Sequence, residues 1–366
     1  MLKLRYIDAL RGWAILGVIM VHSWQAGSAS YIPPQLNNIL VRGSAGVQLF
    51  FFISAFTLFL SANAKYGTEQ HFTGNFFIRR FFRIAPMYYL AIIYFLWQDG
   101  FGPRHSLGDA PGITVENIIG NVLFLHGFNP TWLNSTVPGG WSVAVEMLFY
   151  LFVPFLFHKI KNTQQAAVFF ILSLIFRFIL DNILHRHPLM HNEILWSNYL
   201  FFYFPSQLPA FALGIIFYFI IKDNYQIKIK PSVILLAALI LMLRNAQIDI
   251  IPDYLLCTIA FLLLALALSK FEFKIIVNQV TRYIGKISFS IYLINFAVID
   301  WLKHFQLLNY FTVQSRTEAI ANYTTRFLLV LVVCIFIASF LYYFIELPAQ
   351  KIGYRIIKKR ESKQLL

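Results

Sequence analysis

Residues 323–345 have the sequence YTTRFLLVLVVCIFIASFLYYFI, an apolar run with a single basic residue, Arg326. A helix needs about 20 predominantly apolar residues to cross the hydrocarbon core of a bilayer. The run therefore predicts a membrane-spanning helix, and similar runs recur along the chain.

The composition agrees with this prediction. Of the 366 residues, 58% are hydrophobic and 13% are charged, whereas a soluble domain has about 25% charged residues. We therefore predict an all-α, polytopic membrane protein and exclude a soluble enzyme and a disordered chain. The ten predicted spans are about 7–27, 43–63, 84–98, 139–158, 164–184, 196–221, 231–246, 253–269, 284–302 and 323–345.

The net charge of +14 indicates membrane orientation rather than a nucleic-acid partner. Most Lys and Arg residues lie in alternate loops, on the side that holds the N-terminus and the basic tail. That side is cytoplasmic by the positive-inside rule, so we expect both termini there. We predict a transmembrane domain over 1–350 and a basic cytoplasmic tail over 351–366, which faces anionic headgroups.

Other features limit the class of protein further. The connection 99–138 is long enough to be structured or site-forming, and 117–128 predicts an interfacial or re-entrant helix.

Cys257 and Cys334 lie in apolar runs, so we expect neither a disulfide framework nor a thiolate metal site. The sequence has no glycine loop of the GxxxxGK type, which argues against an ATP-driven pump, and no cleavable signal peptide is apparent.

Ionisable residues share one face of the first predicted span. Arg11 and His22 are eleven residues apart and differ by about 20° around a helix, and Asp8 lies about 40° to the other side of His22. Polar residues inside a membrane are costly and are functional candidates. An imidazole can accept a proton from a hydroxyl, so we predict that His22 is a general base. The alternative is an interfacial Asp8–Arg11 pair with His22 bonded to a backbone carbonyl.

Three arginines precede the third span in the stretch FFIRRFFRIAPMYY. Arg80 and Arg83 share a helical face. A guanidinium group can bind a phosphate through two parallel N–H···O hydrogen bonds. We predict that Arg79, Arg80 and Arg83 bind a phosphate-bearing ligand. The alternative is an ordinary positive-inside anchor, which composition alone favours.

A polar stripe opens the fourth span, in GGWSVAVEMLFYLFVP. Ser142, Glu146 and Tyr150 follow one another at intervals of four residues and lie on one helical face. We predict that Glu146 orients or charges His22, or binds the hydroxyl-bearing substrate, and that Trp141, Ser142 and Tyr150 contact that substrate. The alternative is a structural glutamate between helices.

Two further polar residues lie inside spans without an evident role. Arg177 needs a partner that the sequence does not reveal. For Asn295, an ordinary hydrogen bond between helices is an equally good explanation. Neither residue is therefore assigned to the site.

Seven blocks, in order over about residues 6–351, resemble the transmembrane acyltransferase-3 family, whose members O-acylate bacterial surface polysaccharides and related carbohydrates. The blocks are IDALRGWAILGVIMVH, GVQLFFFISAF, FFIRRFFRIAPMYYL, GGWSVAVEMLFYLFVP, LPAFALG, GKISFSIYL and ELPAQK. The resemblance implies a ten-helix bundle in the bacterial inner membrane. Such a protein moves an acyl group, commonly acetyl, from cytoplasmic acyl-CoA to a hydroxyl on the outer side.

The resemblance also implies roles for individual residues. His22 would be the catalytic histidine, and Arg11, its motif partner, would belong to the catalytic site with it. Arg80 and Arg83 would form the RxxR element at the CoA phosphates, and Glu146 would be the acidic residue of the WSxxxE block. Gln48, Ala55 and Asn295 depart from the family's usual Asp, Gly and His, which puts the substrate in doubt more than the reaction.

The partners follow from the resemblance. We expect acyl-CoA as a donor substrate rather than a tightly bound cofactor, a carbohydrate or glycolipid acceptor, and a surrounding lipid bilayer. No metal ion, no nucleic acid and no additional periplasmic SGNH-type domain are expected, and whether the chain forms a homo-oligomer stays open.

Two rival functions are compatible with part of the sequence. A polysaccharide transporter, flippase or polymerase would suit ten spans with intramembrane charges, but the sequence lacks the paired interrupted helices typical of inverted repeats. A sensor or scaffold without activity is disfavoured because the reactive residues are present.

Overall fold

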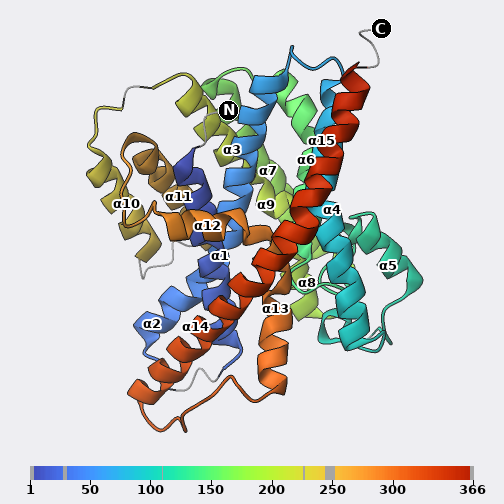
Figure 1. Ribbon diagram of the computed structural model, residues 1–366, viewed down its shortest axis with the longest axis vertical. Coiled ribbons are helices and arrows are strands. Elements are labelled where there is room, and N and C mark those ends of the chain that lie inside the picture. Colours follow the sequence, from blue (N-terminus) through green and yellow to red (C-terminus); the bar gives the residue numbers. More distant parts are fainter. Residues whose placement is uncertain (1–3, 28–30, 109, 226, 244–251, 363–366) are drawn as a thin grey trace. The chain divides into compact units, whose positions relative to one another are not determined.

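The computed structural model describes residues 4–27, 31–108, 110–225, 227–243 and 252–362. Within these ranges every regular element is a helix (Figure 1), which agrees with the predicted all-α class. The end of the seventh predicted span, 244–246, and residues 363–366 of the predicted tail lie outside the described residues.

The chain divides into two compact units, Met1–Ile53 with Tyr225–Tyr342 and Ser54–Asn224 with Tyr343–Leu366. The first unit contains α1 (Arg5–Gln25), α2 (Pro34–Val41), η1 (Arg42–Ala45), α10 (Pro231–Leu243), α11 (Asp253–Lys270), α12 (Gln279–Lys286), α13 (Ser288–His304) and α14 (Arg316–Leu341). The second contains α4 (Phe72–Asp99), η2 (His105–Leu107), α5 (Val115–Val122), η3 (His126–Phe128), α6 (Trp141–Lys159), α7 (Thr163–Arg186), α8 (Glu193–Phe202), α9 (Phe204–Lys222) and α15 (Leu347–Ser362). Along the chain, α3 (Gly46–Lys65) and the π-helix η4 (Tyr342–Glu346) each contain a boundary between the units.

Six helices of the described chain are long and apolar enough to cross a membrane, or seven if the bent pair α12 and α13 is one span. Helices also cover the three remaining predicted segments, as α1, α4 and α10. These lengths support a polytopic membrane protein. The count of ten spans and the cytoplasmic position of the termini stay predictions.

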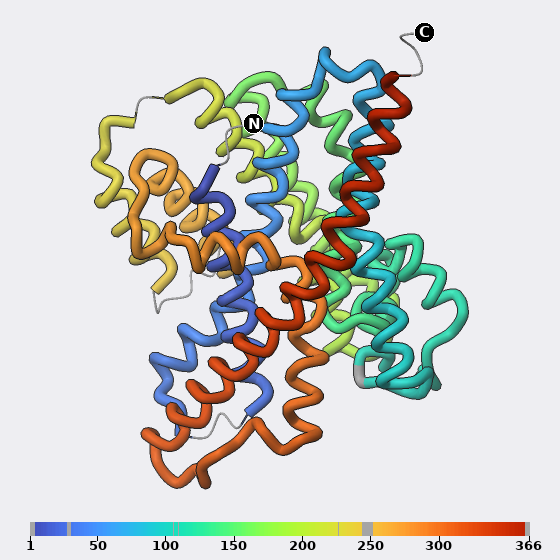
Figure 2. The backbone as a smooth tube through the Cα atoms, in the orientation of Figure 1, coloured from blue at the N-terminus to red at the C-terminus, as the bar shows by residue number. Residues whose placement is uncertain are grey.

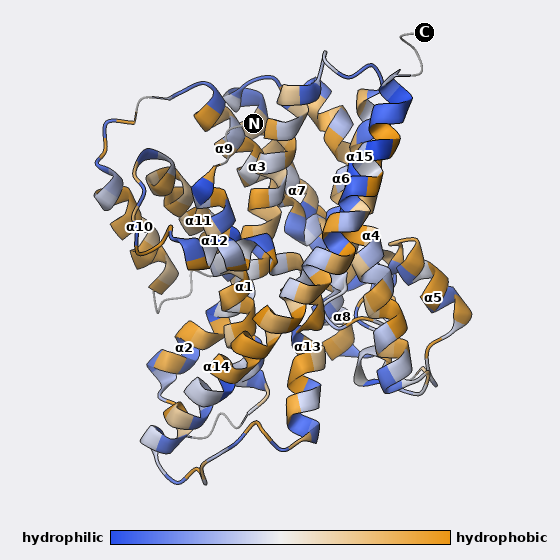
Figure 3. Ribbon diagram, in the orientation of Figure 1, coloured by the Kyte–Doolittle hydropathy of each residue, from blue (hydrophilic) through white to orange (hydrophobic). Residues whose placement is uncertain are grey.

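Helix α7 exposes most of its apolar side chains on the surface of the protein. Its buried residues are Ala166 and Ser173 alone, and the apolar side chain of Phe178 is 69% exposed. A helix that is apolar on its outer face is typical of a lipid-facing segment. In Figure 3, α10 is also coloured mostly apolar, whereas α15 is mostly hydrophilic.

Two predicted spans each contain parts of two α-helices rather than one uninterrupted α-helix. The segment predicted over 196–221 is interrupted at Tyr203, whose extended backbone precedes the first turn of α9, where Pro205 lies. Proline is well placed in a first helical turn because its missing N–H is not needed there. The segment predicted over 284–302 includes a bend of 76° between α12 and α13, and Figure 2 shows the chain turning there.

Close backbone packing sets the position of α1 in the first unit. Helix α1 packs on α12, just as α10 packs beside α11 (Figure 1). A Cβ atom at Gly285 would overlap the carbonyl oxygen of Asp8, and one at Gly12 would overlap the carbonyl oxygen of Thr281. Only glycine fits at these two positions without moving one helix away from the other.

We expect Gly285→Ala to lower the free energy of unfolding by about 1–3 kcal/mol, because the added methyl group overpacks a backbone contact. Thermal unfolding of the purified protein in detergent measures the effect. Gly102→Ala is the control, since an added Cβ there meets no atom within 4 Å, and its change should stay within about 0.5 kcal/mol. Equal melting temperatures for the two variants would contradict the packing described here.

Candidate functional site

His22 lies in the last turn of α1 and is held by two consecutive residues of α13. Its Nδ1 is 2.6 Å from Oδ1 of Asn295, and its ring centroid is 4.1 Å from that of Phe296. Asn295 is fully buried, and its Nδ2 donates to the carbonyl oxygen of Tyr292 at 2.6 Å. The imidazole itself is only partly buried. The structure therefore places His22 in a fixed orientation while leaving it partly accessible.

The backbone next to His22 is also anchored. Arg326 on α14 is 2% exposed, and its Nε donates to the carbonyl oxygen of Ser23 at 2.6 Å. Another nitrogen of the same guanidinium donates to Oδ1 of Asn309 at 2.9 Å. Arg326 thus ties the end of α1 to the segment after α13. The sequence did not predict this buried role, although the position of Arg326 within an apolar run is a signal from which it could have been inferred.

Arg11 lies near the other end of α1, where its guanidinium is 3.7 Å from Oδ1 of Asp8. The Asp8–Arg11 ion pair of the alternative interpretation is therefore present. Arg11 and His22 are about 16 Å apart along the helix axis, too far for their side chains to touch. A catalytic role for Arg11 stays a prediction.

The three arginines of α4 in the second unit have different surroundings. Arg79 donates to both carboxylate oxygens of Glu69, at 2.8 and 2.9 Å, so its guanidinium already has an anionic partner inside the protein. Arg83 lies one turn further along the helix and is partly exposed. Among the three, Arg79 is the least suited to a ligand.

Arg80 is arranged differently from Arg79. Its guanidinium carbon is 5.9 Å from the ring centroid of Tyr150 and 6.0 Å from that of Phe76, distances at which a cation is attracted to a ring face. Its buried Nε has no hydrogen-bond acceptor within the part of the chain that the structure describes. A guanidinium that contacts two aromatic rings and has an N–H group without an acceptor is suited to bind a phosphate oxygen.

Glu146 accepts two short hydrogen bonds within the second unit. The hydroxyls of Ser54 on α3 and Tyr150 on α6 both donate to its Oε1 at 2.6 Å. Tyr150 therefore links the carboxylate of Glu146 to the guanidinium of Arg80. We call Ser54, Glu146, Tyr150 and Arg80 the Glu146 cluster.

The other residues of the predicted polar stripe contact different parts of the protein. Ser142 donates to the carbonyl oxygen of Gly139 at 3.1 Å, and the ring of Trp141 packs on Phe202 with centroids 4.4 Å apart. The pairing of Glu146 with Tyr150 agrees with the predicted stripe. Substrate contacts by Trp141, Ser142 and Tyr150, and an interaction of Glu146 with His22, stay predictions.

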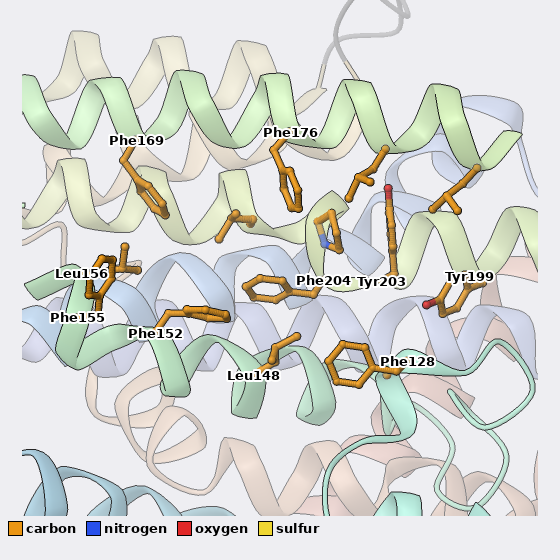
Figure 4. Close-up of a pocket in the computed structure, with 15 residues that line it drawn as sticks. Phe128, Leu148, Phe152, Phe155, Leu156, Phe169, Phe176, Tyr199, Tyr203 and Phe204 are labelled. Carbon is orange, nitrogen blue, oxygen red and sulfur yellow. The ribbon is translucent and has the colours of Figure 1, made fainter. Parts of the chain in front are cut away.

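An apolar cavity of about 600 Å³ lies among α6, α7, α8 and α9 (Figure 4). Phe152, Phe176 and Phe204 are among its lining residues, and Tyr199 and Tyr203 lie at one end. The hydroxyl of Tyr203 donates to Asp181 at 2.7 Å, and Asp181 lies 3.3 Å from Arg177. This is the partner of Arg177 that the sequence did not reveal. None of the predicted site residues lines this cavity.

The connection 99–138 is structured, as predicted. A guanidinium nitrogen of Arg104 donates to the carbonyl oxygen of Ser135, and the other to that of Gly100, each at 2.7 Å. On helix α5, Asn117 is buried, and its side-chain oxygen accepts a hydrogen bond from the Ser135 hydroxyl at 2.7 Å. The apolar side chain of Ile119 on the same helix is 51% exposed. An exposed apolar face is typical of the predicted interfacial helix.

His126 lies in this connection with its side chain fully buried. Its Nε2 is 3.0 Å from the carbonyl oxygen of Gly140 and 3.0 Å from the hydroxyl of Tyr88. Burial disfavours the charged imidazolium and lowers the pKa of His126 to about 4. The side chain is therefore neutral in the folded protein at physiological pH.

We expect acidification from pH 6.5 towards pH 4 to destabilise the protein through His126. The unfolded chain binds a proton near pH 6.5 while the folded one does not, so the free energy of unfolding falls as the pH drops through this window. The loss approaches about 3 kcal/mol below both pKa values. Thermal unfolding measured across the pH range tests this. His126→Gln should show a flatter dependence, and an identical slope would contradict the assignment.

The structure brings forward two buried polar residues, Asn295, which the sequence left unassigned, and Glu346, which it did not single out. Asn295 is the partner of His22, and Glu346, a buried carboxylate in the π-helix η4, accepts from Gln350 at 3.2 Å. π-helical turns often mark functional positions. Glu346 lies in the quoted block ELPAQK, and Asn295 lies two residues after the end of the block GKISFSIYL. In the described residues, no group of three or more His, Cys, Asp or Glu side chains could hold a metal ion.

Comparison with known proteins agrees with the family resemblance found in the sequence. The acyltransferase-3 family model, described as an acyltransferase domain, matches residues 4–343. A protein of Acidianus two-tailed virus named "Putative acetyltransferase ORF330" is 27% identical over 299 residues, which cover 78% of this chain and 80% of that protein. No solved structure matches.

Two relatives from Staphylococcus aureus are longer than the matched region. The protein of strain COL named "Putative O-acetyltransferase SACOL0978" is 26% identical and covers 98% of this chain. The protein of strain NCTC 8325 named "O-acetyltransferase OatA" is 24% identical and covers 95% of this chain. The chain spans 60% and 57% of their respective lengths.

Proposed function

Because the chain belongs to the acyltransferase-3 family, we propose that it is a membrane-bound O-acyltransferase that moves an acyl group, most simply acetyl, from acyl-CoA to a hydroxyl of a cell-surface glycan. The family membership and the O-acetyltransferase names of its relatives support the reaction type. The donor, the acceptor and a location in the bacterial inner membrane belong to the proposal.

His22 performs the proton transfer in this proposal. Its imidazole removes the proton of the acceptor hydroxyl as the oxygen attacks the acyl carbon. The new C–O bond forms, the C–S bond of the thioester breaks, and the proton passes from the imidazolium to the departing CoA sulfur. The observation that carries this role is the short hydrogen bond from His22 to the buried Asn295, together with the packing on Phe296, because a general base must be held in a fixed orientation.

The Glu146 cluster supplies the donor's phosphate contacts in this proposal. Arg80 retains a buried donor without an acceptor in the described chain, and the rings of Tyr150 and Phe76 hold its guanidinium. Glu146 fixes the hydroxyl of Tyr150 and so the face that Arg80 stacks on. Arg83 adds positive charge one turn away, whereas Arg79 serves the structure through Glu69.

A direct assay tests the reaction type. Purified protein in proteoliposomes receives acyl-labelled acetyl-CoA and a glycan acceptor, and both the release of free CoA thiol and the labelling of the glycan are measured. Stoichiometric appearance of thiol and labelled glycan is the expected result. Glycan movement across the bilayer without thiol release would instead establish a transporter.

A further inference from the structure

The surroundings of Asn295 decide which nitrogen of His22 is able to take a proton. The carbonyl oxygen of Tyr292 can only accept a hydrogen bond. It lies 2.6 Å from the side-chain amide of Asn295, so the amide must turn its NH₂ group towards it. The opposite orientation would place two oxygens in repulsive contact. The Oδ1 atom of Asn295 therefore faces His22.

An amide oxygen is likewise only an acceptor. Because Oδ1 is 2.6 Å from Nδ1 of His22, Nδ1 must carry a hydrogen and donate it. A neutral imidazole has one N–H, so Nε2 carries the lone pair. Asn295 is buried with no exposed surface, so water cannot easily replace it in this role.

We infer that Asn295 is a positioning residue that holds His22 in the tautomer with a protonated Nδ1, and that Nε2 is the atom that receives the substrate proton, an inference that rests on the proposed function of His22. The chain of contacts runs from the backbone of Tyr292 through the amide of Asn295 to the imidazole. Phe296, the next residue on α13, restricts rotation of the same ring. When Nε2 takes the hydroxyl proton, Oδ1 continues to accept from Nδ1, so the ring does not have to move between its two protonation states.

Three variants separate this role from a structural one. Asn295→Leu removes the acceptor oxygen, and Thr258→Val is the matched control. Asn295→Asp keeps an acceptor oxygen for Nδ1, and its other oxygen, protonated because it is buried against the carbonyl oxygen of Tyr292, replaces the amide as the donor. Thr258 is buried in the same unit and donates to the carbonyl oxygen of Tyr254 at 2.8 Å. Its loss removes a buried hydrogen bond that does not involve His22.

Steady-state acyl transfer with acetyl-CoA and a glycan acceptor is measured for each variant. Asn295→Leu should lower kcat by about tenfold or more, since a hydrogen bond of about 1.4 kcal/mol corresponds to tenfold in rate, with both KM values unchanged. Asn295→Asp should restore most of kcat, and Thr258→Val should match the parent protein. Melting temperatures establish that each variant is folded.

Other results would overturn the inference. An unchanged kcat in Asn295→Leu, with His22→Ala inactive, would remove the role of Asn295 and leave the proposed function intact. An equal loss of kcat in folded Asn295→Leu and Asn295→Asp would show that activity does not depend on the acceptor oxygen at position 295. Full activity of His22→Ala would overturn the proposed function as well, so the two failures are distinguishable.

Discussion

Replacing His22 with alanine is expected to lower the rate of acyl transfer by about 10²- to 10⁴-fold, the usual contribution of a positioned general base. The physical reason is that the attacking hydroxyl then lacks the base that takes its proton as the C–O bond forms. The rate of CoA release in the presence of the acceptor measures the effect. Thermal unfolding should show that the variant remains folded.

A second variant and a control make this result specific. Glutamine at position 22 retains an amide N–H for the oxygen of Asn295 but cannot accept a proton at neutral pH, so His22→Gln should be as inactive as His22→Ala. His304, an exposed histidine at the end of α13, is the control, and His304→Ala should keep full activity. Activity within about threefold of the parent protein in folded His22→Gln would exclude the role of general base.

Replacing Arg80 with alanine is expected to raise the KM for acyl-CoA by about 10- to 100-fold, since a charge-assisted hydrogen bond is worth about 1.5–3 kcal/mol. The kcat should change much less, because the phosphates lie away from the reacting thioester. Arg80→Lys should recover part of the affinity, as an ammonium group binds phosphate as a point charge rather than as a fork.

Two comparisons test whether the effect arises from phosphate binding. Arg355 is an exposed arginine of α15, and Arg355→Ala removes the same formal charge without touching the Glu146 cluster, so its KM should be unchanged. A thioester of dephospho-CoA lacks one phosphate group. If Arg80 binds that group, the difference between the parent protein and Arg80→Ala should shrink with this donor. Equal KM values for the two proteins with acetyl-CoA would return Arg80 to the role of a membrane anchor.

The pair of Arg79 with Glu69 explains why three adjacent arginines need not share a function. Arg79 is buried, and both oxygens of its carboxylate partner accept from one of its nitrogens. Removing one member of a buried ion pair leaves the other charge uncompensated, which is strongly destabilising. A loss of activity in an Arg79 variant would therefore report on folding before it reported on donor binding.

Local periodicity was enough to predict several features of this protein. The apolar runs predicted the helices, because a chain in lipid must satisfy its backbone hydrogen bonds within each segment. The i, i+4 spacing of Glu146 and Tyr150 placed them on one helical face, where they form a hydrogen bond, and the three-residue spacing of Asp8 and Arg11 allowed the ion pair given as the alternative interpretation. All of these depend on a single helix, whose geometry is the same in any fold. The seven ordered blocks also indicated the family.

Only the tertiary structure decided which partners the site residues have. Asn295 is 273 positions from His22, and Ser54 is 92 positions from Glu146, so no local pattern relates either pair. The sequence alone thus indicated His22 as the candidate base, whereas the folded chain shows that Asn295 is its hydrogen-bond partner, because such contacts join helices that are distant in sequence.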